Sequence, residues 1–204
     1  MDREKIRLRL EGTCDRLGPG SPPRPGVPAA VLIGLVAHPH GPSVILTERT
    51  AHLKNHPAEV SFPGGRVEPD DDGPAAAALR EAFEEIGLDP AKVEVLGCLQ
   101  PYQTVTDFCV SPVVGWIEPP VTFALDTHEV AEVFEIPLSF VLDAANHQRE
   151  GLFWRGEHHS YFVLPYPGRR IWGATAGMLV SLAAALSDHA DVNLPPAQAG
   201  DAHG

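Results

Sequence analysis

Cysteine is scarce in this sequence, which has three cysteines, Cys14, Cys98 and Cys109, among 204 residues. They are too few and too widely spaced for a disulfide framework or a zinc knuckle. Cys98 and Cys109 fall in segments with strand patterns, where we expect buried thiols. We therefore expect a protein of the reducing cytoplasm, where disulfides are rare.

Basic residues and long apolar runs are also in short supply. Lys and Arg number 15 against 27 Asp and Glu, a formal net charge of -12. This charge repels the phosphates of nucleic acids and anionic lipids, so we expect neither as a partner. The longest apolar run, residues 172–186, is shorter than the roughly 20 residues of a membrane-spanning helix. The charged start, MDREKIRLRL, lacks the apolar core of a signal peptide. A homodimer is compatible with the sequence.

The chain does contain a mixture of strand and helix patterns, and 44% of its residues are hydrophobic, enough for a packed core. We predict strands over residues 29–37, 43–48, 93–99 and 108–118, the last interrupted at Pro112. Helices are predicted over 3–10, 74–86 and 175–189, with a short helix within 129–143, a hairpin over 153–164 and an ordered loop over 49–69. The pattern favours an α/β fold with a mixed sheet between helices. We divide it into a helix and linker (1–28), one domain (29–190) and a frayed tail (191–204).

Three carboxylates gather on the helix predicted over residues 74–86, which Gly87, a good C-terminal cap residue, is expected to end. On a helical wheel, Glu81, Glu84 and Glu85 share one side. The apolar side comprises Ala75, Leu79, Ala82, Phe83 and Ile86, and Ala77 and Ala78 leave open space above the carboxylates. A solvated acidic face is the ordinary interpretation. However, acidic groups in the last turn of a helix are disfavoured by its dipole, and like charges four residues apart repel. Three converging carboxylates suit a hard cation such as Mg²⁺ or Mn²⁺.

The segment before this helix favours the same chemistry. Phe62-Pro63-Gly64-Gly65 predicts a tight turn whose glycines let the backbone approach a ligand, and the Gly65 carbonyl is a candidate oxygen ligand. Three acidic residues, Asp70, Asp71 and Asp72, precede the helix. Capping of the helix and compensation of its dipole would by themselves account for them.

Residues 65–88 resemble the Nudix box, a glycine and an acidic residue followed by R-E-x-x-E-E-x-G and an apolar residue. Arg80-Glu81, Glu84-Glu85 and Gly87-Leu88 match its second half. The resemblance implies a Nudix-type α/β/α fold and a hydrolase of nucleoside diphosphates linked to another moiety, dependent on Mg²⁺ or Mn²⁺. The first half departs from the pattern, with Asp in place of Glu and one extra residue. Counting from Gly65 selects Asp71, and counting back from Arg80 selects Asp72.

A second motif, residues 45–65, is similar to the signature of the coenzyme A pyrophosphatase branch of that family. Leu46, Thr47, Arg49 and residues 62–65 match, whereas Lys54 replaces an Arg and Ala58 replaces a Gly. Residues 108–117, 129–142 and 169–179 resemble the same branch. The implied reaction cleaves coenzyme A or its derivatives into 3′-phosphoadenosine 5′-phosphate and a 4′-phosphopantetheine product.

The resemblance also implies a role for each site residue. The expected metal ligands are the Gly65 carbonyl, Glu81, Glu84, Glu85 and Asp71, with Arg80 orienting the glutamates. The expected phosphate contacts are Arg49, Lys54, Gly64 and Gly65. Glu129 and Glu132 are the candidate general bases, with Glu129 slightly favoured. If the metal ions alone activate the water, no dedicated base is needed. Two alternatives stay open: a Nudix hydrolase of ADP-ribose, dinucleotides or oxidised nucleotides, and a non-catalytic domain that binds a nucleotide or acyl-CoA.

Overall fold

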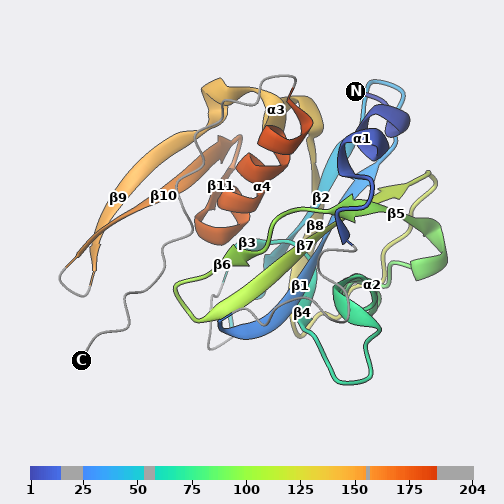
Figure 1. The fold of residues 1–204 in the computed structure, drawn as a ribbon, viewed down its shortest axis with the longest axis horizontal. Helices are drawn as coiled ribbons and strands as arrows, with labels where there is room; N and C mark the ends of the chain where they lie inside the picture. Colours follow the sequence, from blue (N-terminus) through green and yellow to red (C-terminus); the bar gives the residue numbers. More distant parts are fainter. Residues whose placement is uncertain (15–24, 53–57, 155–156, 188–204) are drawn as a thin grey trace.

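The protein is described by a computed structural model that covers residues 1–14, 25–52, 58–154 and 157–187 (Figure 1). Lys54, most of the expected linker, the turn of the expected hairpin and the expected tail from residue 191 lie outside these described residues.

Two β-sheets make up the strand content. In the mixed eight-stranded sheet the strands run in the order β3-β2-β1-β7-β5, with β4 beside β1, β6 beside β7 and β8 beside β2. β1 and β7 pair in parallel and the other pairs are antiparallel. These strands are β1 Val27–Val36, β2 Ser43–Arg49, β3 Val60–Ser61, β4 Gly64–Arg66, β5 Val93–Cys98, β6 Tyr102–Gln103, β7 Phe108–Ile117 and β8 Val130–Pro137. The antiparallel second sheet contains β9 Gln148–Trp154, β10 Glu157–Tyr166 and β11 Arg169–Trp172.

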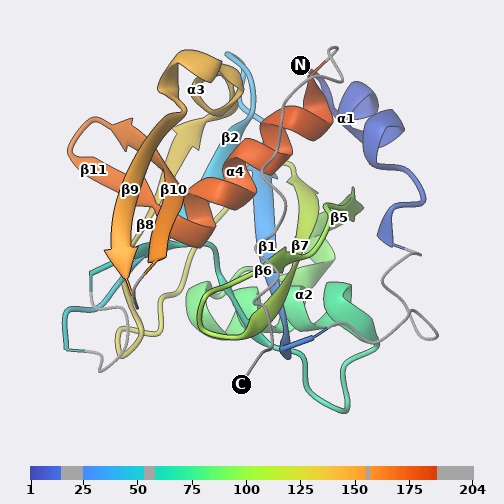
Figure 2. The ribbon, with the colours of Figure 1, turned by 60° about the vertical axis from the view of Figure 1, so that its left-hand side comes forward.

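Helices cover both faces of the large sheet. They are α1 Arg3–Leu10, α2 Gly73–Ile86, α3 Leu138–Leu142 and α4 Gly173–Leu186, with 3₁₀ turns at Pro90–Lys92 and Ala144–Asn146. Alternate side chains of β1 enter two separate cores, Ile33 and Leu35 on the side of α4, Leu32 and Val36 on the side of α2. Figure 2 shows α4 crossing in front of the sheet and the small sheet lying against α4. The expected α/β fold with a mixed sheet between helices is therefore confirmed.

Several elements differ from the sequence prediction. The loop predicted over residues 49–69 contains β3 and β4, and β8 precedes the expected short helix. β7 is not interrupted at Pro112. β5 pairs with Val113–Ile117 and β6 pairs with Cys109 and Val110, so Pro112 lies between the two pairings, and its carbonyl accepts a hydrogen bond from Leu99 N at 2.9 Å. A proline is tolerated there because these neighbours do not pair with it.

The N-terminal segment is fastened to the edge strand β5. Leu10 of α1 is buried in the core beneath α4, and the chain then passes β5 so closely that a Cβ on Gly97 would lie 2.6 Å from the Leu10 Cβ. Cys14 forms a disulfide with Cys98, while Cys109 is not part of it. The expectation of a buried Cys98 thiol is therefore wrong, because Cys14, 84 residues away in sequence, is its neighbour in space. Because disulfides are rare in the reducing cytoplasm, the cysteines of this chain no longer indicate that compartment.

None of the helices in the described ranges combines the length and the apolar character needed to cross a lipid bilayer.

Candidate active site

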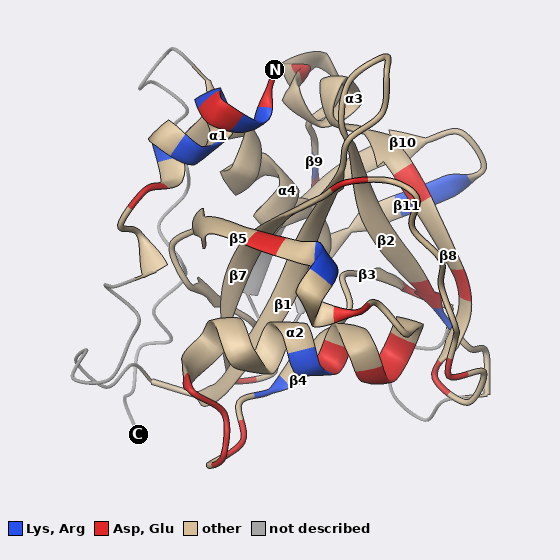
Figure 3. Ribbon diagram, turned by 90° about the vertical axis from the view of Figure 1, so that its right-hand side faces the viewer, with Lys and Arg blue, Asp and Glu red and all other residues tan. Residues whose placement is uncertain are grey.

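Helix α2 lies over the start of β1 and over β4 (Figure 3). Much of the predicted apolar side is confirmed, because Ala82 and Ile86 are buried and Ala75 and Leu79 pack against the same core. The buried positions are Ala77, Ala78, Ala82, Glu85 and Ile86, whereas Phe83 is 55% exposed. Small alanines let the helix approach the sheet closely, so no open space lies above Ala77 and Ala78. The buried face is thus broader than the wheel predicts, and it includes Glu85, which lies against the sheet. The helix ends as predicted at Gly87, which adopts the left-handed conformation at φ 66°.

Glu85 is a buried carboxylate, at 6% exposure. Its Oε2 accepts a hydrogen bond of 3.3 Å from the backbone N–H of Gly64 in β4. Burial is the largest cause that raises the pKa of Glu85 to about 8, and the nearby negative charges of Glu81 and Glu129 contribute to the increase. The positive charge of Arg49 and the Gly64 hydrogen bond act in the opposite direction. A buried carboxylate with so little compensation is suited to a cation that replaces its proton.

Glu81 lies directly above the glycine turn. A Cβ on Gly65 would approach the Glu81 carboxyl carbon to 2.5 Å, so only glycine leaves room for this side chain. The Glu81 side chain is 17% exposed, and burial raises its pKa despite a 3.0 Å bond from Arg80 Nη1. Glu81 and Glu85 therefore both approach the Gly64–Gly65 turn, as the sequence predicts.

Arg80 joins the helix to the loop before it. Its Nε and Nη2 donate to the two oxygens of Asp71 at 3.0 Å each, and its Nη1 donates to Glu81 and, at 3.1 Å, to Glu84. Nη2 also donates to the backbone oxygen of Arg66 at 3.0 Å. The orienting salt bridges predicted for Arg80 are present. The Glu84 side chain is 56% exposed and faces solvent beside Arg80.

Asp71, and not Asp72, is the partner of Arg80. Its side chain is 6% exposed, it accepts a further bond of 2.8 Å from the backbone N–H of Glu68, and Arg80 holds its pKa below the ordinary value. Asp72 is exposed and its side chain caps no helical N–H. Because both Asp71 oxygens are engaged, the geometry favours a role in positioning Arg80 over the predicted role as a metal ligand.

Of the two candidate bases, the structure brings only Glu129 to the box. Arg49 Nη2 lies 4.0 Å from Glu129 Oε2, and the Thr50 N–H donates to the Glu129 carbonyl at 2.9 Å. The Glu129 charge acts on both Glu81 and Glu85. Glu132 instead forms an ion pair with Arg169 of β11. Successive strand residues point to opposite faces, which separates the Glu132 carboxylate from the box.

The loop that carries Glu129 is anchored to the end of α2 by hydrogen bonds that the sequence did not predict. Ala124 N donates to the Ile86 carbonyl and Asp126 N donates to the Glu85 carbonyl, each at 2.9 Å. The Asp126 carbonyl in turn accepts a bond of 3.0 Å from Glu129 N. The loop thus hydrogen-bonds to carbonyls that have no partner within the helix at the end of α2. The loop sequence has no periodicity that would predict these contacts.

A metal fits the chemistry of this donor set. In the ranges the structure covers, no three His, Cys, Asp or Glu side chains are already arranged around a common point suitable for an ion. Even so, the carboxylates of Glu81 and Glu85 are substantially buried, have raised pKa values and converge on a glycine turn. Such an all-oxygen set matches Mg²⁺ or Mn²⁺ better than a softer ion.

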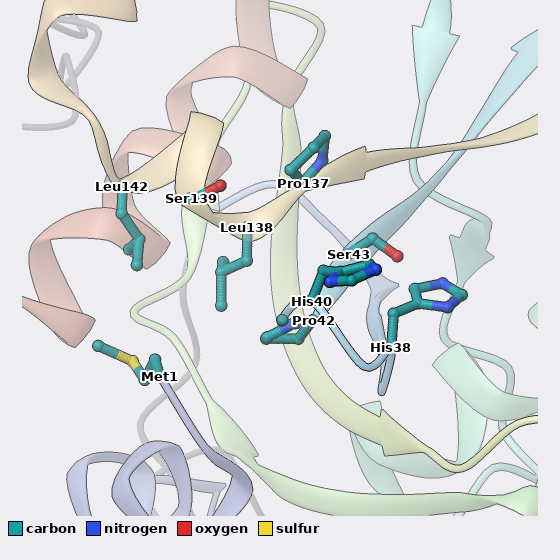
Figure 4. A pocket seen from close by; sticks show the side chains of 10 residues that line it. Met1, His38, His40, Pro42, Ser43, Pro137, Leu138, Ser139 and Leu142 are labelled. Atoms are coloured by element: carbon teal, nitrogen blue, oxygen red, sulfur yellow. The ribbon is translucent and has the colours of Figure 1, made fainter.

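A cavity of about 470 Å³ lies far from these residues, at the opposite end of the strands (Figure 4). Its walls come from the β1–β2 turn, including His38, His40 and Pro42, and from Leu138 and Leu142 of α3. The carboxylates of the box take no part in it.

Comparison with known proteins agrees with this fold. The model of the NUDIX domain matches residues 27–155, and the chain therefore belongs to the Nudix family. It is an enzyme of the Nudix hydrolase type, which acts on pyrophosphate bonds.

Curated relatives share much of its length. An uncharacterized Nudix hydrolase, NudL, of Escherichia coli O7:K1 (strain IAI39 / ExPEC) is 42% identical over 155 residues, which are 76% of this chain and 80% of NudL. NudL of Escherichia fergusonii has the same identity and coverage. Among solved structures, a Nudix hydrolase from M. smegmatis, RenU, is similar at 20% identity and a TM-score of 0.49, over 55% of this chain and 71% of that one. A likeness of that degree bears on neither substrate nor mechanism.

Proposed function

We propose that this Nudix hydrolase cleaves the pyrophosphate bond of coenzyme A or its derivatives, giving 3′-phosphoadenosine 5′-phosphate and a 4′-phosphopantetheine product. The observation that carries the proposal is Arg49, which the upstream motif supplies and which lies at the box. Its charge acts on Glu85 and its guanidinium lies 4.0 Å from Glu129. A guanidinium beside the catalytic carboxylates is suited to a phosphate of the substrate.

In this proposal Glu81, Glu84, Glu85 and the Gly65 carbonyl hold Mg²⁺ or Mn²⁺. When bound, the ion neutralises charge on the pyrophosphate and lowers the pKa of water. Burial keeps Glu85 in a low-dielectric position and the Gly64 N–H orients it. Arg80, fixed by Asp71, orients Glu81 and Glu84.

Glu129 is the proposed general base. Its loop is anchored to the end of α2, and its carboxylate is close enough to act on Glu81 and Glu85. The carboxylate of Glu129, 4.0 Å from the Arg49 guanidinium, is the group that would accept a proton from the attacking water.

A substrate panel tests the proposal. Coenzyme A, dephospho-coenzyme A, ADP-ribose, a diadenosine polyphosphate and an oxidised nucleoside triphosphate are incubated with the enzyme and Mg²⁺ or Mn²⁺, and the products are separated by chromatography. We expect coenzyme A to be cleaved with the highest kcat/KM. Preferential cleavage of another compound overturns the substrate assignment in favour of a different Nudix activity, and binding without cleavage of any compound overturns the catalytic proposal.

Arg49→Gln tests the residue that carries the argument. We expect it to raise KM for coenzyme A by about tenfold or more, since one charge-assisted phosphate contact is worth roughly 1.5–3 kcal/mol. Arg3→Gln is the control, because Arg3 pairs with Glu94 at the surface near the N-terminus. An unchanged KM in Arg49→Gln removes the phosphate contact. A KM raised for coenzyme A but not for dephospho-coenzyme A assigns that contact to the 3′-phosphate.

A further inference from the structure

Two carboxylates of like charge face each other across β2 and β8. Glu48 and Glu132 are direct partners in the antiparallel pairing of these strands. Like charges at directly opposite positions destabilise a strand pair. β8 is also an edge strand with β2 as its partner in the sheet. A cation between the two carboxylates would therefore stabilise the pairing of β8 with β2 at this end.

Arg169, from β11 of the other sheet, supplies that cation. Its Nη1 donates to Glu48 and its Nη2 donates to Glu132 at 2.5 Å. Its guanidinium also lies over the ring of Phe134 in β8, 3.9 Å from the ring centroid. The Arg169 side chain is 19% exposed and that of Glu132 is 54% exposed, so one fork-shaped group links β2 and β8 at the edge of the sheet.

The segments of β2 and β8 that Arg169 joins lie next to the active site. Immediately after the Glu48–Glu132 pair the register shifts, because Arg49 pairs with Val130 and Ala131 is skipped. This bulge brings Glu129, next to Val130, alongside Arg49. A bulge commonly redirects a side chain in this manner. The orientation of Glu129 therefore depends on how firmly β8 is held to β2 one residue beyond the bulge.

We propose that Arg169 is a positioning residue for hydrolysis. By joining Glu48 to Glu132 it fixes the bulge that holds Glu129 beside Arg49 and the carboxylates of the box. This inference rests on the proposed role of Glu129 as the base. It gives Arg169 an effect on catalysis although the side chain lies on the other face of the sheet and touches no box residue.

Kinetics of Arg169→Gln test the proposal, with coenzyme A as substrate, or ADP-ribose if coenzyme A is not cleaved. We expect kcat to fall by about tenfold to a hundredfold, the effect of displacing a catalytic group by roughly 1 Å, with KM within about twofold of the wild type. Arg170→Gln is the matched control. Arg170 is the neighbour on β11 and pairs with Glu150 of the small sheet, so its kcat and KM should be unchanged. A wild-type kcat in Arg169→Gln overturns the proposal.

Two double variants separate positioning from a general structural role. If Arg169 acts through Glu129, adding Arg169→Gln to Glu129→Gln causes no further loss of kcat, whereas losses that multiply contradict the proposal. Adding Glu132→Gln to Arg169→Gln removes the repulsion across the strands and should raise kcat above that of Arg169→Gln alone; no recovery also counts against it. Should Arg169→Gln not fold, Arg169→Lys, which keeps the charge and loses the fork, takes its place in both comparisons.

The proposed role of Glu129 as the general base can be tested independently of Arg169. A wild-type kcat in Glu129→Gln alone would remove the base from the proposed function, whatever Arg169→Gln shows.

Discussion

Replacing Glu85 with glutamine should abolish activity and yet stabilise the metal-free protein. Glu85 is 6% exposed, and burial raises its pKa from the ordinary value of 4.5 to about 8. Glutamine has nearly the same shape as the protonated acid, can accept the Gly64 hydrogen bond and does not ionise. The variant therefore avoids the cost of holding an acidic group in a buried position.

The magnitude follows from the two pKa values. Because the pKa is raised on folding, the native state binds this proton more tightly than the unfolded chain does. The contribution of Glu85 to stability is complete below pH 4.5 and is lost as the pH rises toward about 8. At about 1.4 kcal/mol per pH unit, the loss at pH 7 is about 3 kcal/mol. For a chain of this size that corresponds to a Tm difference of about 6 to 12 °C.

The assay is thermal unfolding in the presence of EDTA at a series of pH values between about 4 and 8. We expect Glu85→Gln and the wild type to unfold at similar temperatures at the acidic end. The variant should gain steadily toward neutral pH. With excess Mg²⁺ the wild type should gain stability through binding, and the variant should lose most of that gain.

Glu84→Gln is the matched control. Glu84 is a second expected ligand of the same ion, but its side chain is 56% exposed and its ion pair with Arg80 contributes little to stability. We expect a large loss of kcat with a metal-free Tm close to that of the wild type. The reasoning is refuted if metal-free Glu85→Gln melts no higher than the wild type at neutral pH.

Two further substitutions test the geometry of the turn and of its arginine. Gly65→Ala forces Glu81 aside, because the added Cβ would lie 2.5 Å from its carboxyl carbon. We therefore expect kcat to fall by about tenfold or more at a nearly unchanged Tm. Initial rates and a circular-dichroism melt distinguish this result from a general loss of fold. Asp71→Asn removes a bidentate partner of Arg80 and should cost about 1–3 kcal/mol in urea unfolding, whereas exposed Asp72→Asn should stay within about 0.5 kcal/mol. Equal losses from the two Asp variants would show that Arg80 does not depend on Asp71.

Helix α2 shows how much of the site can be predicted from local sequence. The start and end of α2, with Gly87 as its C-terminal cap, and the glycine turn before it were predicted from local sequence, because turn and cap chemistry acts over a few residues. The wheel nevertheless missed part of the buried face. It placed Ala82 and Ile86 correctly but counted Phe83 as buried, and it left out Ala77, Ala78 and Glu85, which the close fit of α2 against the sheet buries.

By itself, the sequence determined the family, the mixed α/β architecture and the presence of a carboxylate-rich helix beside a glycine turn, since each depends on residues that are close together in the chain. The tertiary structure alone decided that Asp71 supports Arg80, that Glu129 and not Glu132 reaches the box, and that Cys14 meets Cys98. It also placed Arg169 between Glu48 and Glu132. Apart from Asp71 and Arg80, these contacts join residues far apart in the chain, and the Asp71 contact is set by the path of a loop without periodicity. Their geometry is fixed when sheets, helices and loops pack together, and no local pattern records it.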